Sequence, residues 1–463
     1  MMYVPYPELT ASERYAGSNV INSKQVIVSP EELLGSSQTL SVGDQFTLTS
    51  IGSEPAYLVK QNGLPWRAFY TASGMEVEGL SPQLAESSAR SFYRNLYSRE
   101  PDNVLFQETI DMDQWTISSG LNAHRPLHLI SIGDVAGTHF YVSSRTGQVM
   151  LDTNRSERVW NWLGSILHWI YPLQLRKNAN AWVNVIITLS LVGLFSILTG
   201  AIIGINRLRI KPSYTGKGVS PYQGMAKYHH ILGLVILLFL TTFMFSGLMS
   251  MGPWGLFDSK TSYAQQLYEY QANNNGSNSN TTYSKAAELR RLLEQNENQR
   301  VKQIDWLWLD GTSYIALHDA PDIVRTSLSL TSPDYLNQQV MNNLPRLISG
   351  SKIQDTQILP EYDTYYYTRR SMHRPLPVLR VKFEDPESTW FHIDMATGQI
   401  VDRRTSRDRI QRWVFNGLHS LDFPVLLNNR PVWDIVVILL CSLGLLFSIT
   451  SVAVAWRRIK PKR

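Results

Sequence analysis

Three long stretches of the chain contain no charged residue, and they constrain the fold more than any other feature. Ala181–Ile205, Ile231–Met251 and Ile435–Trp456 each run for more than twenty residues without Asp, Glu, Lys or Arg. A helix needs about 20 apolar residues to cross roughly 30 Å of hydrocarbon, and a buried helix of a soluble protein rarely runs so long without a charge. We therefore predict three transmembrane helices, at 181–205, 231–251 and 435–456.

Basic residues in the short flanks predict the orientation of these helices. The flank 206–230 contains five basic residues and no acidic one, and the tail 457–463 does the same: Arg207, Arg209, Lys211, Lys217 and Lys227, then Arg457, Arg458, Lys460, Lys462 and Arg463. The positive-inside rule places both flanks in the cytoplasm. The polar regions 1–180 and 252–434 then lie on the opposite side, which in a bacterium is the periplasm. We expect a multi-pass inner-membrane protein with a cytoplasmic C-terminus.

Composition excludes several classes of site. The single cysteine, Cys441, allows no intrachain disulfide, no Cys-based zinc or iron–sulfur site and no covalent haem. The 43 basic and 38 acidic residues leave a net charge of +5 without a long basic run, so nucleic-acid binding is not expected.

An internal repeat appears when the sequence is shifted by 251 residues. Rare residue types then coincide in the same order: Thr146-Gly147-Gln148 with Thr397-Gly398-Gln399, Arg158 with Arg409, Trp162 with Trp413, His168 with His419, Asn178 with Asn429, and Trp182 with Trp433. Shared apolarity alone would not align Trp, His and Asn residues outside the helices. The chain is therefore predicted to be internally duplicated.

Each repeat is expected to contain a leading helix, an outer domain, an interfacial segment and a return helix. In the second repeat these are 231–251, 252–405, 406–430 and 435–456. The first repeat supplies an outer domain at 1–155, an interfacial segment at 156–180 and a helix at 181–205, followed by the loop 206–230. Its leading helix is missing, because Met1–Pro7 is too short and too rich in proline to span a membrane. We therefore expect a four-helix bundle whose first helix would be encoded upstream of Met1.

The outer regions show α+β patterning. Ser29-Pro30-Glu31-Glu32 is a helix start, and Ile304–Leu309 followed by Asp310-Gly311 indicates a hairpin. Leu379, Val381 and Phe383 alternate with polar residues, and Tyr365–Tyr367 is expected in a strand. The Asn/Ser/Gly-rich run Asn273–Asn280 is expected to be a flexible loop. No nucleophile elbow, phosphate loop or HExxH pattern is present in the sequence.

Two HRPL segments, His124–Leu127 and His373–Leu376, offer histidines that could be ligands or substrate contacts. We favour a structural interpretation, in which Arg and Pro precede a strand, because Pro is common at strand starts.

Four histidines are the candidates for chemistry. His168 and His419 occupy equivalent positions in Trp-containing interfacial segments, just before the return helices. Each could be an ordinary polar residue of an amphipathic segment. However, two halves related by a pseudo-two-fold axis would bring the pair together, as a haem iron with two axial imidazoles requires.

His229 and His230 lie at the cytoplasmic mouth of the second span, where the alternative is a polar helix end. Neighbouring helical residues point about 100° apart, so we do not expect both to bind one iron. A haem near each face of the membrane would provide an electron path across it.

The assembled pattern resembles the PepSY-associated transmembrane family, often described as iron-uptake or iron-regulated membrane proteins. The resemblance rests on MMYVPYPELTASER at 1–14, HHILGL at 229–234, SGLMSM at 246–251, HRPLPVLRVKF at 373–383 and RWVFNGLHSLDFP at 412–424. It implies four inner-membrane helices and two PepSY-like periplasmic domains, and some members resemble haem-dependent ferric-siderophore reductases. Carried over by position, His168, His229, His230 and His419 are the candidate haem ligands.

Our leading hypothesis is a membrane-bound b-haem protein that passes electrons outward to a periplasmic acceptor such as a ferric chelate. The sequence contains no nicotinamide or flavin fingerprint, so a quinol or a redox protein would be the donor. The second hypothesis is a non-enzymatic, membrane-anchored PepSY module that assists uptake or restrains a periplasmic partner. A transporter is less favoured, because the spans contain no charged residue.

Overall fold

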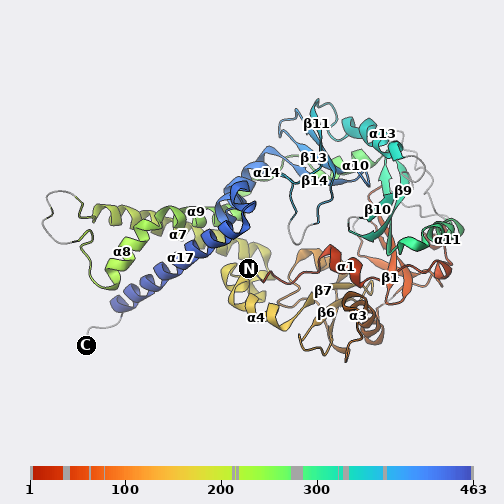
Figure 1. The fold of residues 1–463 in the computed structure, drawn as a ribbon, viewed down its shortest axis with the longest axis horizontal. Helices are drawn as coiled ribbons and strands as arrows, with labels where there is room; N and C mark the ends of the chain where they lie inside the picture. Colours follow the sequence, from red (N-terminus) through yellow and green to blue (C-terminus); the bar gives the residue numbers. More distant parts are fainter. Residues whose placement is uncertain are drawn as a thin grey trace. The chain divides into compact units, whose positions relative to one another are not determined.

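The computed structural model describes residues 4–34, 42–61, 64–77, 79–210, 214, 218–272, 285–321, 323–326, 333–368 and 373–459. The chain divides into two compact units (Figure 1). Met1–Lys177 and Thr261–Arg404 form the sheet unit; Asn178–Lys260 and Thr405–Arg463 form the helical unit. The expected loop at Asn273–Asn280 and several of the basic flanking residues (Lys211, Lys217, Lys460, Lys462 and Arg463) lie outside the described residues.

Within its described residues, the sheet unit contains three antiparallel sheets. The first has the strand order β10-β9-β8-β1-β2-β3, formed by Ile323–Thr326, Thr312–Ala320, Gln303–Leu309, Gln45–Ile51, Glu54–Lys60 and Arg67–Tyr70. The second runs β4-β5-β6-β7, formed by Leu105–Ile110, Leu127–Ser131, His139–Ser143 and Val149–Thr153. The third runs β11-β12-β13-β14, formed by Ile353–Leu359, Val378–Phe383, Trp390–Asp394 and Ile400–Arg404.

The first sheet joins segments that are distant in the sequence. Strands β1 and β8 pair directly, with Phe46 opposite Trp306 and Leu48 opposite Ile304. One apolar core lies against this junction and includes Val26 and Leu289, which come from the two outer regions. The two regions therefore share a sheet and a core, which the sequence pattern did not reveal.

The second and third sheets have the same strand order, and two pairs of corresponding strands recur at the same spacing. Strands β6 and β13 begin and end 251 residues apart, as do β7 and β14. Strand β5 begins directly after Pro126, as expected for the first HRPL segment. Strand β12 begins at Val378, two residues beyond the second segment.

One helix of the sheet unit, α2 (Pro30–Leu34), begins at the capping box that the sequence predicts. The Ser29 hydroxyl accepts the Glu32 backbone N–H at 3.0 Å, and the Glu32 carboxylate accepts the Ser29 N–H at 2.8 Å, which confirms the predicted helix start. The helices are α1 (Ala11–Gly17), α2 (Pro30–Leu34), α3 (Pro82–Tyr97), α4 (Arg155–Leu163), α5 (Ser165–His168), α6 (Leu173–Arg176), α10 (Tyr263–Gln271), α11 (Ala286–Gln295) and α13 (Pro333–Asn343).

Two local predictions have opposite outcomes. The hairpin at Asp310-Gly311 is confirmed: both residues have positive φ and connect β8 to β9. The strand expected at Tyr365–Tyr367 is wrong, because Tyr365 and Tyr366 lie in a bend and Tyr367 follows it outside any strand. The Asp363 carboxylate accepts the backbone N–H groups of Tyr365 and Tyr366 at 2.9 and 2.8 Å, and this local turn replaces strand pairing.

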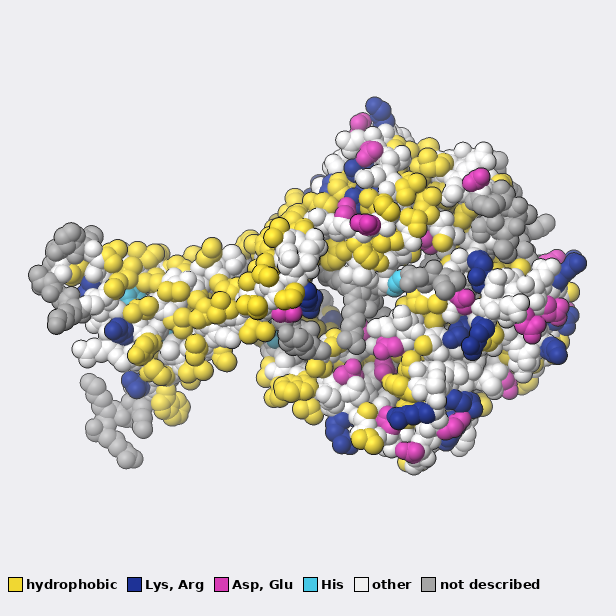
Figure 2. Space-filling model, viewed as in Figure 1, with side chains coloured by type: hydrophobic (Ala, Val, Ile, Leu, Met, Phe, Trp, Pro, Cys, Tyr) yellow, Lys and Arg dark blue, Asp and Glu magenta, His cyan; other side chains and the backbone are white. Residues whose placement is uncertain are grey.

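The helical unit contains long apolar helices. Of the described residues, two helices are long and apolar enough to cross a membrane: α7 (Ala179–Asn206) and α17 (Arg430–Ile459). They contain the first and third predicted spans. Figure 2 shows hydrophobic side chains covering the visible face of these helices, whereas Lys, Arg, Asp and Glu side chains gather over the sheet unit.

The second predicted span is not a single helix. It divides at Ile236 into α8 (Met225–Val235) and α9 (Leu237–Ser250), which are bent by 69°. Gly233, one turn before the bend, packs against the Phe447 ring. The pair is either a broken span or a re-entrant segment, so the segment expected as one helix at 231–251 is two helices, and its crossing of the membrane stays a prediction. Short helical segments precede α17: α14 (Ser406–Gln411), a π-helical turn (Arg412–Gly417), α15 (Leu418–Ser420) and α16 (Pro424–Leu427).

Candidate functional site

A cavity of about 550 Å³ lies within the helical unit. Its wall is mostly apolar, with a few polar groups, and its volume falls within the roughly 300–1,000 Å³ typical of cofactor and small-molecule sites. The lining residues include Gly200 and Gly204 of α7, His229 and His230 of α8, and Phe447, Ser451 and Arg458 of α17.

Glycines shape this cavity in two ways. A Cβ added at Gly200 would have no heavy atom within 4 Å, so this position leaves open space. A Cβ at Gly233 would lie 2.8 Å from the Phe447 ring, and one at Gly204 would lie 3.2 Å from Leu234. Gly204 and Gly233 thus bring helices together, as small residues do in membrane helix packing.

His229 lines the cavity and is held through one ring nitrogen. Its Nδ1 lies 3.3 Å from both Thr450 Oγ1 and Ser451 Oγ of α17. Its ring stacks on Phe447, with centroids 4.6 Å apart and planes 18° apart. Among the described residues, the hydrogen bonds of His229 use Nδ1 and leave Nε2 for a ligand.

His230 is held through both ring nitrogens. Nε2 lies 2.8 Å from the Gly204 carbonyl and Nδ1 lies 2.8 Å from Ser220 Oγ. The side chain is buried, and the Tyr222 ring packs edge-on against it. The two adjacent histidines therefore differ in role. His230 connects α8 to α7 through hydrogen bonds at both ring nitrogens, whereas the hydrogen bonds of His229 among the described residues use only Nδ1.

His168 and His419 lie in different units. His168 ends α5 of the sheet unit and is exposed. His419 lies in α15, directly after the π-helical turn, and its Nδ1 is 3.0 Å from Ser246 Oγ of α9. The pairing of His168 with His419 remains a prediction.

The donor set around the cavity fits a haem better than a metal ion held by side chains alone. Among the described residues, no group of three or more His, Cys, Asp or Glu side chains is placed to hold a metal ion. A haem iron needs only one or two axial side chains, with the second ring nitrogen of a histidine ligand commonly hydrogen-bonded. His229 has this arrangement, and Arg458 adds a cation that suits a carboxylate.

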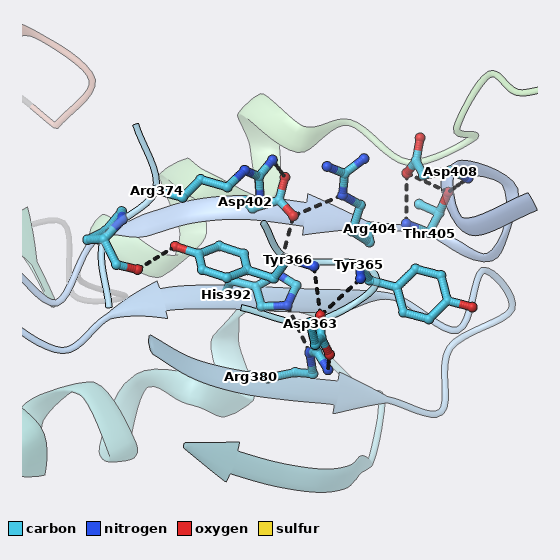
Figure 3. A network of polar contacts seen from close by, with 11 residues as sticks. Asp363, Tyr365, Tyr366, Arg374, Arg380, His392, Asp402, Arg404, Thr405 and Asp408 are labelled. Carbon is cyan, nitrogen blue, oxygen red and sulfur yellow. Dashed lines mark hydrogen bonds and ion pairs between the residues drawn. The ribbon is translucent and has the colours of Figure 1, made fainter. Parts of the chain in front are cut away.

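A second constellation, a buried polar network, lies in the sheet β11–β14 (Figure 3). Arg380 donates Nε–H to His392 Nε2 at 2.8 Å and binds Asp363 through its other two nitrogens at 2.6 and 2.9 Å. His392 Nδ1 lies 3.3 Å from Asp402, which also accepts from Arg374 at 2.9 Å. This network links β12, β13 and β14 through side chains.

Burial and charge shift the pKa values of this network. Burial lowers the pKa of His392, and Asp402 only partly opposes that shift. Burial would raise the pKa of Asp402, but the hydrogen bonds from His392 and Arg374 and the charge of Arg404 lower it to about 2. At neutral pH the network therefore holds a neutral His392 beside an ionised Asp402.

Sequence patterning missed this network. The alternation of β12 places Arg380 on the face opposite Leu379, and that face is also covered, because Tyr366 stacks on His392 with centroids 4.6 Å apart. In the sheet β4–β7, the positions 251 residues earlier hold Leu129, Tyr141 and Leu151 in place of Arg380, His392 and Asp402. Comparing the two repeats at these positions is the sequence signal that could have found the network.

Apolar helices of membrane-spanning length, joined in one chain to a folded sheet unit, define a membrane protein with mixed helices and antiparallel sheets. The family model described as the PepSY-associated TM region matches residues 130–458, which is most of the chain. The chain belongs to this PepSY-associated transmembrane family. Comparison with curated proteins finds no match.

Proposed function

We propose that this protein is a membrane-anchored b-haem protein that passes electrons across the membrane to an acceptor outside the cell membrane, such as a ferric siderophore. The observation that carries the proposal is His229, which lines a mostly apolar cavity of about 550 Å³ and is hydrogen-bonded only through Nδ1 among the described residues. Haem, when bound, would supply a one-electron carrier.

The residues of the chain would bind and orient this group. His229 would offer Nε2 as an axial ligand, and Gly200 leaves room for a flat ligand. Arg458 lies in the last turn of α17, where a cation can pair with a carboxylate near the membrane surface. The largely apolar wall would exclude water and hold the macrocycle.

The proposed electron path has a second haem site, with His168 and His419 as ligands, because these residues occupy equivalent positions in a duplicated chain. The strand boundaries that recur 251 residues apart support the duplication, with two PepSY-like outer domains and a helical bundle. The basic flanks support the orientation in which these domains face the periplasm of a bacterial cell and the C-terminus faces the cytoplasm. A quinol or a redox protein would supply the electrons.

The test is a reduced-minus-oxidised visible spectrum of the purified protein. We expect a Soret shift and an α band typical of a b-haem. His229→Ala should lose haem, whereas the matched control His230→Gln, which keeps a donor for the Gly204 carbonyl, should retain it. His168→Ala and His419→Ala should each reduce haem content.

Two results would contradict parts of this proposal. A wild-type protein without haem bands would reject the redox function and favour a non-enzymatic PepSY module that assists uptake or restrains a partner. Full haem content in both His168→Ala and His419→Ala would reject that pair as ligands while leaving the cavity site intact.

A further inference from the structure

Two histidines of the helical unit each contact the same short motif on a neighbouring helix. The motif is a Phe followed three residues later by Thr or Ser. In α17, Phe447 stacks on His229 and Thr450 Oγ1 lies 3.3 Å from its Nδ1. In α9, the Phe243 ring lies 5.2 Å from the His419 ring and Ser246 Oγ lies 3.0 Å from its Nδ1. Each motif offers a ring and a hydroxyl to one imidazole.

The direction of these hydrogen bonds follows from where the hydroxyl protons go. Thr450 and Ser451 both donate to the Phe447 carbonyl, at 2.7 and 2.8 Å, and Ser246 donates to the Phe243 carbonyl at 3.1 Å. A hydroxyl has one proton, so each oxygen can then only accept from the histidine. With both hydroxyl protons directed to the Phe447 carbonyl, Thr450 Oγ1 and Ser451 Oγ accept from His229, and in this arrangement the proton of His229 lies on Nδ1.

We infer that Phe447, Thr450 and Ser451 are positioning residues that hold His229 in the Nδ1–H tautomer and keep the Nε2 lone pair for a ligand in the cavity. The identity of that ligand as haem rests on the proposed function, whereas the tautomer does not. A hydrogen bond at one ring nitrogen determines which nitrogen can ligate, and it raises the basicity of the ligand.

The neighbouring His230 provides an internal contrast. Its Nε2 faces the Gly204 carbonyl, which can only accept, so in the neutral ring the proton is on Nε2. Ser220 Oγ can then donate to Nδ1 at 2.8 Å. Adjacent histidines are thus held in opposite tautomers, and only His229 has the tautomer that leaves Nε2 unprotonated.

The direct test is ¹⁵N NMR of the full chain purified without haem and labelled at histidine, with the His229 signals assigned by their loss in His229→Gln. We expect an Nδ1–H signature for His229 in the wild type. Thr450→Val combined with Ser451→Ala should convert part or all of His229 to the Nε2–H form. Thr450→Ser, which keeps the hydroxyl, should preserve the wild-type signature.

Ser448→Ala is the matched control, because Ser448 lies on the same helix and donates to the Gly444 carbonyl at 2.9 Å in the same way. It should leave the His229 signals unchanged. An Nε2–H signature for His229 in the wild type, or no change in the double variant, would overturn the inference.

Titration with hemin gives a second measurement. The double variant should bind hemin about 10–100-fold more weakly than the wild type, as losses of outer-shell partners of metal ligands usually do, and Ser448→Ala should bind it equally well. Equal affinity of the double variant and the wild type would count against a positioning role. A wild type that binds no hemin would reject the proposed function, and the NMR result would still decide the tautomer.

Discussion

His392 lies fully buried between Arg380 and Asp402, and this placement makes stability depend on pH. Because burial lowers its pKa in the folded protein, His392 stays neutral at a pH where the unfolded chain binds a proton. The free energy of unfolding therefore does not depend on His392 above its unfolded pKa of about 6.5. It decreases as the pH falls from that value towards the lower pKa of His392 in the folded protein.

We predict that His392→Gln, which keeps polar atoms without titrating, flattens the pH dependence of unfolding below pH 6.5. One proton taken up on unfolding corresponds to a slope of at most about 1.4 kcal/mol per pH unit. The measurement is the unfolding midpoint of both proteins at several pH values between 5 and 7.5. Equal slopes in the two proteins would show that His392 does not carry this dependence.

At the scale of the element, glycines decide how closely the apolar helices pack. A Cβ at Gly233 would lie 2.8 Å from the Phe447 ring, a distance that requires α8 or α17 to shift, whereas a Cβ at Gly200 meets nothing within 4 Å. Both residues lie inside helices, so alanine improves helix propensity by a similar amount at each position.

We predict that Gly233→Ala destabilises the helical unit by about 1–3 kcal/mol, the usual cost of overpacking. Gly200→Ala should be neutral or slightly stabilising. Thermal unfolding of the two variants in the same detergent measures the difference. A Gly233→Ala protein as stable as Gly200→Ala would show that the α8–α17 contact is loose.

Elements were predicted well where one local rule decides them. The long stretches without a charged residue predicted α7 and α17. The Ser29 cap predicted the start of α2, and the Asp310-Gly311 turn predicted the hairpin between β8 and β9. Local rules failed where a distant contact decides. The bend at Ile236 has no Pro or Gly at its centre, and the Phe-x-x-Thr and Phe-x-x-Ser motifs gain meaning only when another helix brings His229 or His419 to them.

At the scale of the whole molecule, the repeat predicted two related outer domains, and the structure joins the two regions through one sheet. Alternation within a strand shows which side chains share a face, yet it does not identify the partner strand. The pairing of β1 with β8 connects residues more than 250 positions apart, and it is fixed by contacts such as the edge-on packing of Trp306 against Phe46, with centroids 4.8 Å apart.

This junction predicts that a defect in one outer region loosens the other. Trp306 of β8 is 3% exposed, so Trp306→Ala should cost about 3–5 kcal/mol. Because β1 pairs with β8 and shares its core, backbone amides of Gln45–Ile51 should lose protection from hydrogen exchange together with those of Thr312–Ala320. Trp162→Ala, at a residue that is 49% exposed, should leave both segments protected. Loss of protection confined to residues 303–320 would mean that the two outer regions unfold independently despite their shared sheet.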